Sequence, residues 1–400
     1  MVNKLLQIVF LLTLFSASSQ ANILKFELLP SPENCDKNER IYSHAGDVNN
    51  NGVVVQTTNC YLNSGQFVGI SSIYDSGKLE IIPYLDDSRP YSEATAINDD
   101  GVIVGSAATF RNTTAFIYSN GELEEIERLA GSYNSSMSDI NSDGLAIGAS
   151  NSPGGVRVFF YENGVQTEFE LPDELGPYPF PVGVTQDGTV IGRTGRYGPG
   201  PSDIGYIYSE DELQLININS SPQTSQISGF NDIGDIVGYL GTPFGTRPYV
   251  YNYLSGELRI IEELLPGDRL AYDPAINNSG VVVGTSSNNS AENLIQRGFY
   301  LDPIEGLFDL SDLVIKMPED FIMSSNFSIS DSGYISGSGV FTDADGKFDP
   351  WNSSSFAFLL SPIGVPSPST FLIFLTTLVG MIFSRKNDSA HSPLNLDINR

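Results

Sequence analysis

Three carboxylates in one short segment are the residues that could most directly hold a metal ion. Asp343, Asp345 and Asp349 lie beside a glycine, and carboxylate oxygens are the ligands that calcium prefers. A solvated acidic loop explains the same segment, so a bound calcium ion is one of two interpretations. The chain has only two histidines, His44 and His391, which excludes a metal site built from several imidazoles.

A second candidate site consists of cationic and aromatic side chains in long segments that we expect to be loops. Loops on a rigid scaffold commonly carry binding residues, and aromatic rings with scattered polar groups suit sugar rings. Ordinary surface loops explain the same residues. These candidate ligand-binding residues are Arg193, Arg196, Tyr197, Arg247, Tyr272, Arg297 and Trp351.

No set of residues indicates a catalytic nucleophile. Gly337-Ser338-Gly339 comes nearest to a nucleophile motif, but it lies in an expected strand, and His44 is the only plausible base. Two carboxylates at a hydrolytic separation could still come together in the fold, because the chain holds 48 Asp and Glu residues. We therefore assign no catalytic residue and expect a protein that is not an enzyme, with a polysaccharide hydrolase as the alternative.

Residues 1–21 have the features of a secretory signal peptide. Lys4 precedes an apolar run over residues 5–15, and Ser19 and Ala21 are small residues at the positions that signal peptidase recognises. A retained anchor is the alternative, although such a run is short for a membrane span. Export would place the only two cysteines, Cys35 and Cys60, in an oxidising compartment where they can form a disulfide. Two buried thiols are the other interpretation.

The C-terminal segment combines a Pro-containing motif, a short apolar stretch and a basic pair. Val365-Pro366-Ser367-Pro368 precedes an apolar stretch over residues 371–383, and Arg385-Lys386 follows it. Residues 364–386 therefore resemble a PEP-CTERM sorting signal, with Ser367 in place of the usual Glu, and residues 387–400 form a polar cytoplasmic tail. The resemblance implies processing by an exosortase-type protease and delivery to the Gram-negative outer surface or the exopolysaccharide. A plain C-terminal membrane anchor is the alternative.

The middle of the chain is one motif repeated seven times. Each copy reads as a short apolar strand, an Asn- or Asp-rich turn with a glycine, and a β-branched strand, as in Ala96–Gly105. Asp47 and Asp139 begin two copies in the manner of a calcium loop, but both copies lack the acidic residue that ends such a loop. Hairpin turns explain all seven copies. The turn glycines recur at positions 52, 101, 144, 188, 234, 280 and 333.

A second hairpin follows in most units, most clearly over residues 115–126, where Asn120-Gly121 forms the tight turn. Four strands per unit at this period are typical of propeller blades. The last unit has only three strands, and we expect residues 22–30 to supply the fourth, with Leu24, Phe26 and Leu28 on one face. The sequence thus predicts an all-β fold: a seven-bladed β-propeller over residues 22–363, closed by pairing the mature N-terminal strand with the last blade. An open β-solenoid or two smaller sheets are the alternatives.

The repeat also resembles the HAF family of bacterial extracellular repeats. Its Ile-Asn-x-x-Gly core is present at 97–101, 140–144 and 276–280, and an Ala-Phe pair is present at 115–116 and 357–358. The family's Trp is replaced here by tyrosine, as at Tyr118 and Tyr161. The resemblance implies an extracellular repeat protein and no defined reaction.

The composition and the net charge restrict the kinds of partner that we expect the protein to bind. With 40% hydrophobic and 17% charged residues the chain is not disordered, and a net charge of −28 argues against nucleic acid as a partner. We expect an exported, cell-surface or exopolysaccharide-associated protein that acts as a non-catalytic binding or matrix module. Its partners would be an exosortase-type protease and either exopolysaccharide or another surface protein. No cofactor is expected apart from the calcium ion considered above.

Overall fold

The computed structural model describes residues 23–363 apart from 37–38, 111, 170, 195–203, 210–211, 217–224, 289–295 and 343–352. Residues Ile23–Pro362 form one compact unit. Strands dominate the described residues of this unit, whose two helices are single 3-10 turns, η1 (Asp173–Leu175) and η2 (Leu310–Leu313). No helix among the described residues is long and apolar enough to cross a membrane. The expected signal peptide and sorting signal lie outside the described residues.

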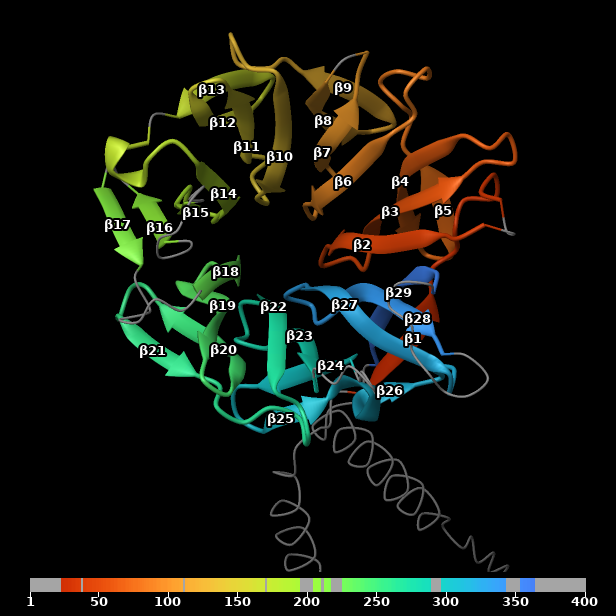
Figure 1. The fold of residues 1–400 in the computed structure, drawn as a ribbon, viewed down its shortest axis with the longest axis vertical. Coiled ribbons are helices and arrows are strands. Elements are labelled where there is room, and N and C mark those ends of the chain that lie inside the picture. The colour runs from red at the N-terminus through yellow and green to blue at the C-terminus, as the bar shows by residue number, and fades with distance from the viewer. Residues whose placement is uncertain are drawn as a thin grey trace, which may run out of the picture. The chain divides into compact units, whose positions relative to one another are not determined.

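The described strands form five four-stranded antiparallel sheets and one sheet of nine strands (Figure 1). The five sheets, in chain order, are β6 (Ser92–Ile97), β7 (Ile103–Ala108), β8 (Thr113–Ser119), β9 (Glu122–Ile126); β10 (Asn134–Ile140), β11 (Ala146–Ser152), β12 (Gly155–Glu162), β13 (Val165–Phe169); β14 (Pro179–Val184), β15 (Val190–Thr194), β16 (Ile204–Ser209), β17 (Glu212–Ile216); β18 (Ser225–Phe230), β19 (Asp235–Thr242), β20 (Gly245–Asn252), β21 (Glu257–Ile260); and β22 (Leu270–Ile276), β23 (Val282–Ser287), β24 (Gln296–Asp302), β25 (Gly306–Asp309).

The nine-stranded sheet contains both ends of the described chain. Its first part is β2 (Tyr42–Val48), β3 (Val54–Tyr61), β4 (Phe67–Asp75) and β5 (Lys78–Ile81). Its second part is β27 (Phe321–Ile329), β28 (Ile335–Phe341), β29 (Ser355–Pro362) and β1 (Leu24–Leu28), to which the short β26 (Val314–Ile315) adds in parallel. One parallel bridge, Tyr42 to Ser355, joins the two parts. β1 runs antiparallel to β29, from Leu24 opposite Pro362 to Leu28 opposite Phe358.

The faces of β1 differ in one respect from the expected alternation. Leu24 and Phe26 are buried as expected, but Leu28 is 38% exposed, and the neighbouring Leu29 is 3% exposed instead. The strand ends at Leu28, and Leu29 packs with Ala45 and other core residues of the β2–β5 sheet. The expectation that Leu28 lies on the same buried face as Leu24 and Phe26 was wrong, because the regular alternation of the strand ends before Leu28.

Successive sheets pack with the second strand of one against the first strand of the next, including β28 of the last sheet against β2 of the first. Within the unit, Figure 1 shows the sheets following one another around a common centre, with the first strand of each innermost. This arrangement brings the turns between first and second strands together at one end of the centre.

A glycine on six of the seven second strands explains the last position of the repeat. Gly105 on β7 pairs directly with Phe116 on β8, whose ring is fully buried. A Cβ atom at Gly105 would lie 2.8 Å from Phe116 Cζ, so only glycine leaves room for the ring. The same Gly–aromatic pairing recurs at Gly148–Phe159, Gly192–Tyr206, Gly238–Tyr249, Gly284–Phe299 and Gly337–Phe358.

Tyrosines on the third strands of several sheets connect neighbouring sheets. Tyr118 on β8 donates a hydrogen bond of 2.7 Å to Glu80 on β5 of the preceding sheet, and Tyr161 on β12 donates one of 2.7 Å to Glu124 on β9. Tyr74 on β4 donates to Glu27 on β1 in the same manner. In the first sheet, a disulfide joins Cys35 and Cys60.

Candidate functional site

The Asn-containing turns form a continuous network of hydrogen bonds. The side-chain amide of Asn98 donates to the backbone oxygen of Asn141 in the next repeat at 3.1 Å, while its Oδ1 accepts from the backbone N–H of Val102 within its own turn at 2.9 Å. Asparagine is suited to this position because its amide both closes its own turn and reaches the next one. Equivalent bonds run Asn49 to Asn98, Asn141 to Thr185, Asn231 to Asn277 and Asn277 to Ser330.

Two further bonds join the repeats that this amide series leaves out. The backbone N–H of Gln186 donates to Asp232 at 2.9 Å, which connects the fourth repeat with the fifth. The backbone N–H of Ser332 donates to Asn50 Oδ1 at 2.8 Å, which connects the seventh repeat with the first. Each repeat is therefore hydrogen-bonded to the next through its turn.

A cavity of about 200 Å³ lies within this set of turns and is lined by residues from all seven repeats. Five carboxylates line it, and none of the described residues in its wall is Lys, Arg or His. We call it the turn-end cavity. Its carboxylates are Asp47, Asp99, Asp139, Asp232 and Asp331.

Asp139 is one of two acids in the turn-end cavity whose pKa is raised. Its side chain is half-buried at the end of β10, and Oδ2 accepts a 3.0 Å hydrogen bond from the backbone N–H of Val184 in the next sheet. Desolvation by the surrounding protein raises its pKa to about 6, and the negative charges of Asp47 and Asp232 act in the same direction. The hydrogen bond from Val184 opposes this shift without cancelling it.

Asp47 occupies the equivalent position in the first repeat. Burial also raises its pKa, although it accepts hydrogen bonds from Ser328 Oγ at 2.6 Å and from the backbone N–H groups of Val48 and Ile97 at 2.8 and 3.2 Å. The other five repeats have Ala96, Gly183, Gly229, Ala275 and Ser328 at this position. Two carboxylates therefore face the centre where the rest of the repeat has small side chains.

This pair offers acid–base chemistry. A carboxyl group with a pKa near 6 can donate a proton at mildly acidic pH, and an ionised carboxylate in the wall of the same cavity can accept one. The described residues contain no group of three or more His, Cys, Asp or Glu side chains placed to hold a metal ion. Our sequence reasoning explained Asp47 and Asp139 by turn chemistry alone and missed this pairing. Their occurrence in only two of seven copies was the signal that could have found it.

A second cavity, of about 440 Å³, lies toward the other end of the same inner strands. We call it the loop-end cavity. Its wall includes Phe180 and Arg193 from the third four-stranded sheet, Asp273 from β22, and Asn326 from β27. Burial raises the pKa of Asp273, and the charge of Arg193 acts in the opposite direction. Of the predicted ligand-binding residues, Arg193 thus lines a cavity, and Tyr272 lies beside this cavity and packs its ring edge-on against Tyr239.

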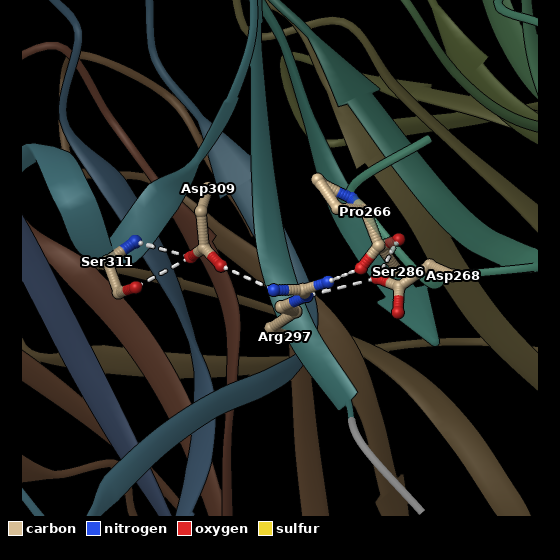
Figure 2. A network of polar contacts seen from close by, with 6 residues as sticks. All are labelled: Pro266, Asp268, Ser286, Arg297, Asp309 and Ser311. Carbon is tan, nitrogen blue, oxygen red and sulfur yellow. Dashed lines mark hydrogen bonds and ion pairs between the residues drawn. The ribbon is translucent and has the colours of Figure 1, made fainter. Parts of the chain in front are cut away.

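Arg297 and Arg247 bind groups of the protein itself. Figure 2 shows the Arg297 guanidinium between Asp268 and Asp309, at 3.1 and 3.2 Å, with a third hydrogen bond of 2.7 Å to the backbone oxygen of Pro266. Asp268 is almost fully buried and also accepts from Ser286 Oγ at 2.6 Å. Arg247 donates to the backbone oxygens of Thr246, Glu262 and Arg269. Both arginines hold the long connections between strands in place.

Several candidate residues lie outside the described part of the chain. They include Arg196, Tyr197 and Trp351 of the ligand-binding set and the acidic group Asp343, Asp345 and Asp349. The sorting motif Val365–Pro368 and the basic pair Arg385-Lys386 also lie there. These remain predictions from the sequence.

The fold is shared with solved structures of low sequence identity. The β-propeller domain of the Trilobed protease from Pyrococcus furiosus, described as having an open velcro topology, matches with a TM-score of 0.53 at 12% identity, over 82% of this chain and 97% of that one. An oligogalacturonate lyase in complex with manganese matches with a TM-score of 0.53 at 11% identity, over 86% of this chain and 97% of that one. No family model matches the sequence, and no curated protein sequence does.

An acylaminoacyl peptidase from Pyrococcus horikoshii matches with a TM-score of 0.51 at 12% identity, over 83% of this chain. The match spans about half of that peptidase, 54% of its chain. These structures contradict our expectation that the chain is not an enzyme, because peptidases and a lyase carry the same fold. At such low identity the likeness establishes the fold alone. The chain is an all-β protein with the fold of β-propeller domains found in enzymes.

Proposed function

We propose that the protein is an exported enzyme that cleaves a polysaccharide on a seven-bladed propeller closed by the pairing of β1 with β29. The seven repeats, the antiparallel register of β1 and β29 and the hydrogen bond from Ser332 to Asn50 support the blade number and the closure. The disulfide between Cys35 and Cys60 supports export, since such bonds persist in oxidising compartments. Processing of residues 364–386 by an exosortase-type protease belongs to the same proposal.

The placement of Asp139 and Asp47 in the wall of one cavity is the observation that carries the proposed reaction, and the pKa of Asp139, raised to about 6, supports its role as the acid. Protonated Asp139 would donate its proton to the glycosidic oxygen as that bond breaks. Ionised Asp47 would accept a proton from the water molecule that attacks the sugar carbon, so that water is added across the bond. The lyase with this fold is named for acting on an oligosaccharide, which supports a carbohydrate as the substrate class.

The substitution Asp139→Asn tests this reaction. We expect it to lower the rate of reducing-end release from the producing organism's exopolysaccharide by at least about a hundredfold, since general acid catalysis contributes this much or more. The rate of the unmodified enzyme should fall as the pH rises above about 6, where Asp139 loses its proton. The measurement is a reducing-end assay between pH 4 and 8 with the exported full chain.

Asp143→Asn is the matched control. Asp143 lies in the same turn, but its side chain is exposed and is not part of the turn-end cavity wall. This variant should keep the rate and the pH profile of the unmodified enzyme. Release of no reducing ends by the unmodified protein, or an unchanged rate in Asp139→Asn, would contradict the proposed reaction.

A further inference from the structure

The last two inner strands break the repeat at one position. The position in question lies two residues before the one that faces the centre, which is Asp139 in β10. In five of the seven inner strands this position is buried between sheets and holds Ala45, Ala94, Met137, Pro181 and Ile227. In β22 and β27 the same position holds Asp273 and Asn326. Both side chains are exposed, and both backbones are left-handed, with φ of 45° and 53°.

Left-handed backbone is unfavourable for residues other than glycine, and it persists only where the surroundings impose it. Both residues lie at irregularities in strand pairing, between Tyr272 and Ala275 in β22 and between Ser325 and Ser328 in β27. These irregularities turn two polar side chains out of the packing between sheets and into the wall of the loop-end cavity. The other five inner strands have an apolar residue at this position.

We propose that the loop-end cavity binds a neutral sugar residue of a glycan. Its volume of about 440 Å³ lies within the range of small-molecule sites. The ring of Phe180, which is 37% exposed, supplies an apolar face for a sugar ring. Asp273, Asn326, Gln226 and Arg193 supply planar polar groups for its hydroxyls.

The charges in the cavity favour a neutral ligand over an ionised one. One carboxylate, Asp273, and one guanidinium, Arg193, line the described wall, and the charge of Arg193 acts on Asp273. Gln226 is positioned by a hydrogen bond that its Oε1 accepts from Tyr239. An acidic sugar would meet Asp273 and a cationic sugar would meet Arg193, so neither is preferred.

This site is independent of the proposed cleavage. The two cavities are lined by different segments of the chain, with residues 226–228 of β18 at the loop end, and the last residue of β18 and the turn after it, residues 230–232, at the turn end. Sugar binding at the loop end therefore does not require that Asp139 act as an acid. Asp139→Asn should lower the rate of cleavage and leave binding at the loop-end cavity intact.

Titration calorimetry with the exported full chain tests the proposal. The probes are neutral tetrasaccharides (cellotetraose, laminaritetraose and maltotetraose), acidic tetragalacturonate and cationic glucosamine tetramer. We expect saturable binding of at least one neutral probe, with a Kd of about 1 mM or tighter. The absence of binding by every neutral probe, or binding of charged probes alone, would overturn the proposal.

Asp273→Gly separates a binding role from a structural one. Glycine accepts the backbone conformation at this position without strain, so the melting temperature should stay the same or rise. The affinity for the neutral probe should fall at least about tenfold, because the polar side chain is lost. Asn163→Gly removes a side chain from another left-handed position, with φ of 51°, outside the cavity wall, and should leave affinity unchanged. An unchanged affinity in Asp273→Gly would overturn the proposal.

Discussion

At the scale of single residues, the close packing of glycine under an aromatic ring accounts for the most regular feature of the sequence. Gly105→Ala would place a Cβ atom against the backbone oxygen of Glu93 and 2.8 Å from Phe116 Cζ. Because backbone and a fully buried ring cannot both move aside, we expect a loss of about 1–3 kcal/mol in the free energy of unfolding. Denaturant unfolding of the variant measures this loss.

Gly154→Ala is the control for that substitution. A Cβ atom at Gly154 has its nearest neighbour 3.8 Å away, and its backbone is not left-handed. This variant should unfold at the same denaturant concentration as the unmodified protein. Equal stability of the two variants would show that the ring does not require glycine beneath it.

In the first sheet, one cross-strand pair differs from the repeat in a way that the sequence pattern did not predict. There the Gly–aromatic pair is replaced by Gln56 opposite Ser72, and the amide of Gln56 reaches the backbone oxygen of Pro30 at 2.9 Å. The tight turn at Asn120-Gly121, by contrast, was predictable and is confirmed, since both residues have positive φ. Local turn chemistry is encoded in adjacent residues, whereas a compensating pair depends on strands brought together by the fold.

At the scale of elements, hydrogen bonds between sheets determine how firmly each strand is held. Tyr118 is almost fully buried, and desolvation together with its bond to Glu80 raises its pKa to about 12. Tyr74 makes the same contact with Glu27 of β1, and its pKa is likewise raised to about 12. Both phenols therefore stay neutral and donate to a carboxylate at ordinary pH.

Tyr74→Phe and Tyr118→Phe form a matched pair of variants. Together they test whether β1 is held in the last sheet as stably as an internal strand is held in its own sheet. Each substitution removes a hydrogen bond to a charged group, and we expect each to cost about 1.5–3 kcal/mol of stability. If β1 is integral, both variants should lose similar stability, measured by thermal unfolding. A negligible effect of Tyr74→Phe beside a clear effect of Tyr118→Phe would contradict closure by β1.

Sequence periodicity was sufficient to predict the strands but not to predict which side chains face the centre. The inner strands carry an irregularity just before the residue that faces the centre, as between Met137 and Asp139 in β10. An irregularity of this kind moves a side chain from one face to another, so alternation along the strand could not show that Asp139 points inward. The same effect hides Asp273, whose position is buried and apolar in five of the other six repeats.

At the scale of the whole molecule, acidic residues determine how the free energy of unfolding depends on pH. The chain has a net charge of −28, and Asp139 is ionised at pH 7 at an energetic cost, because its pKa rises from 3.8 to about 6 on folding. Between these two values the folded state binds more protons than the unfolded state. Stability should therefore increase as the pH falls from 7 towards 5.

Asp139→Asn isolates this contribution. The full shift corresponds to about 3 kcal/mol, which contact with solvent in the cavity reduces to about 1–2 kcal/mol. The variant lacks the ionisable group, so it should be more stable than the unmodified protein at pH 7 and should gain less on acidification. Melting temperatures at pH 5, 6 and 7 measure the difference, with Asp143→Asn expected to follow the unmodified protein. A variant that is less stable at pH 7 would mean that the hydrogen bond from Val184 outweighs the burial of the charge.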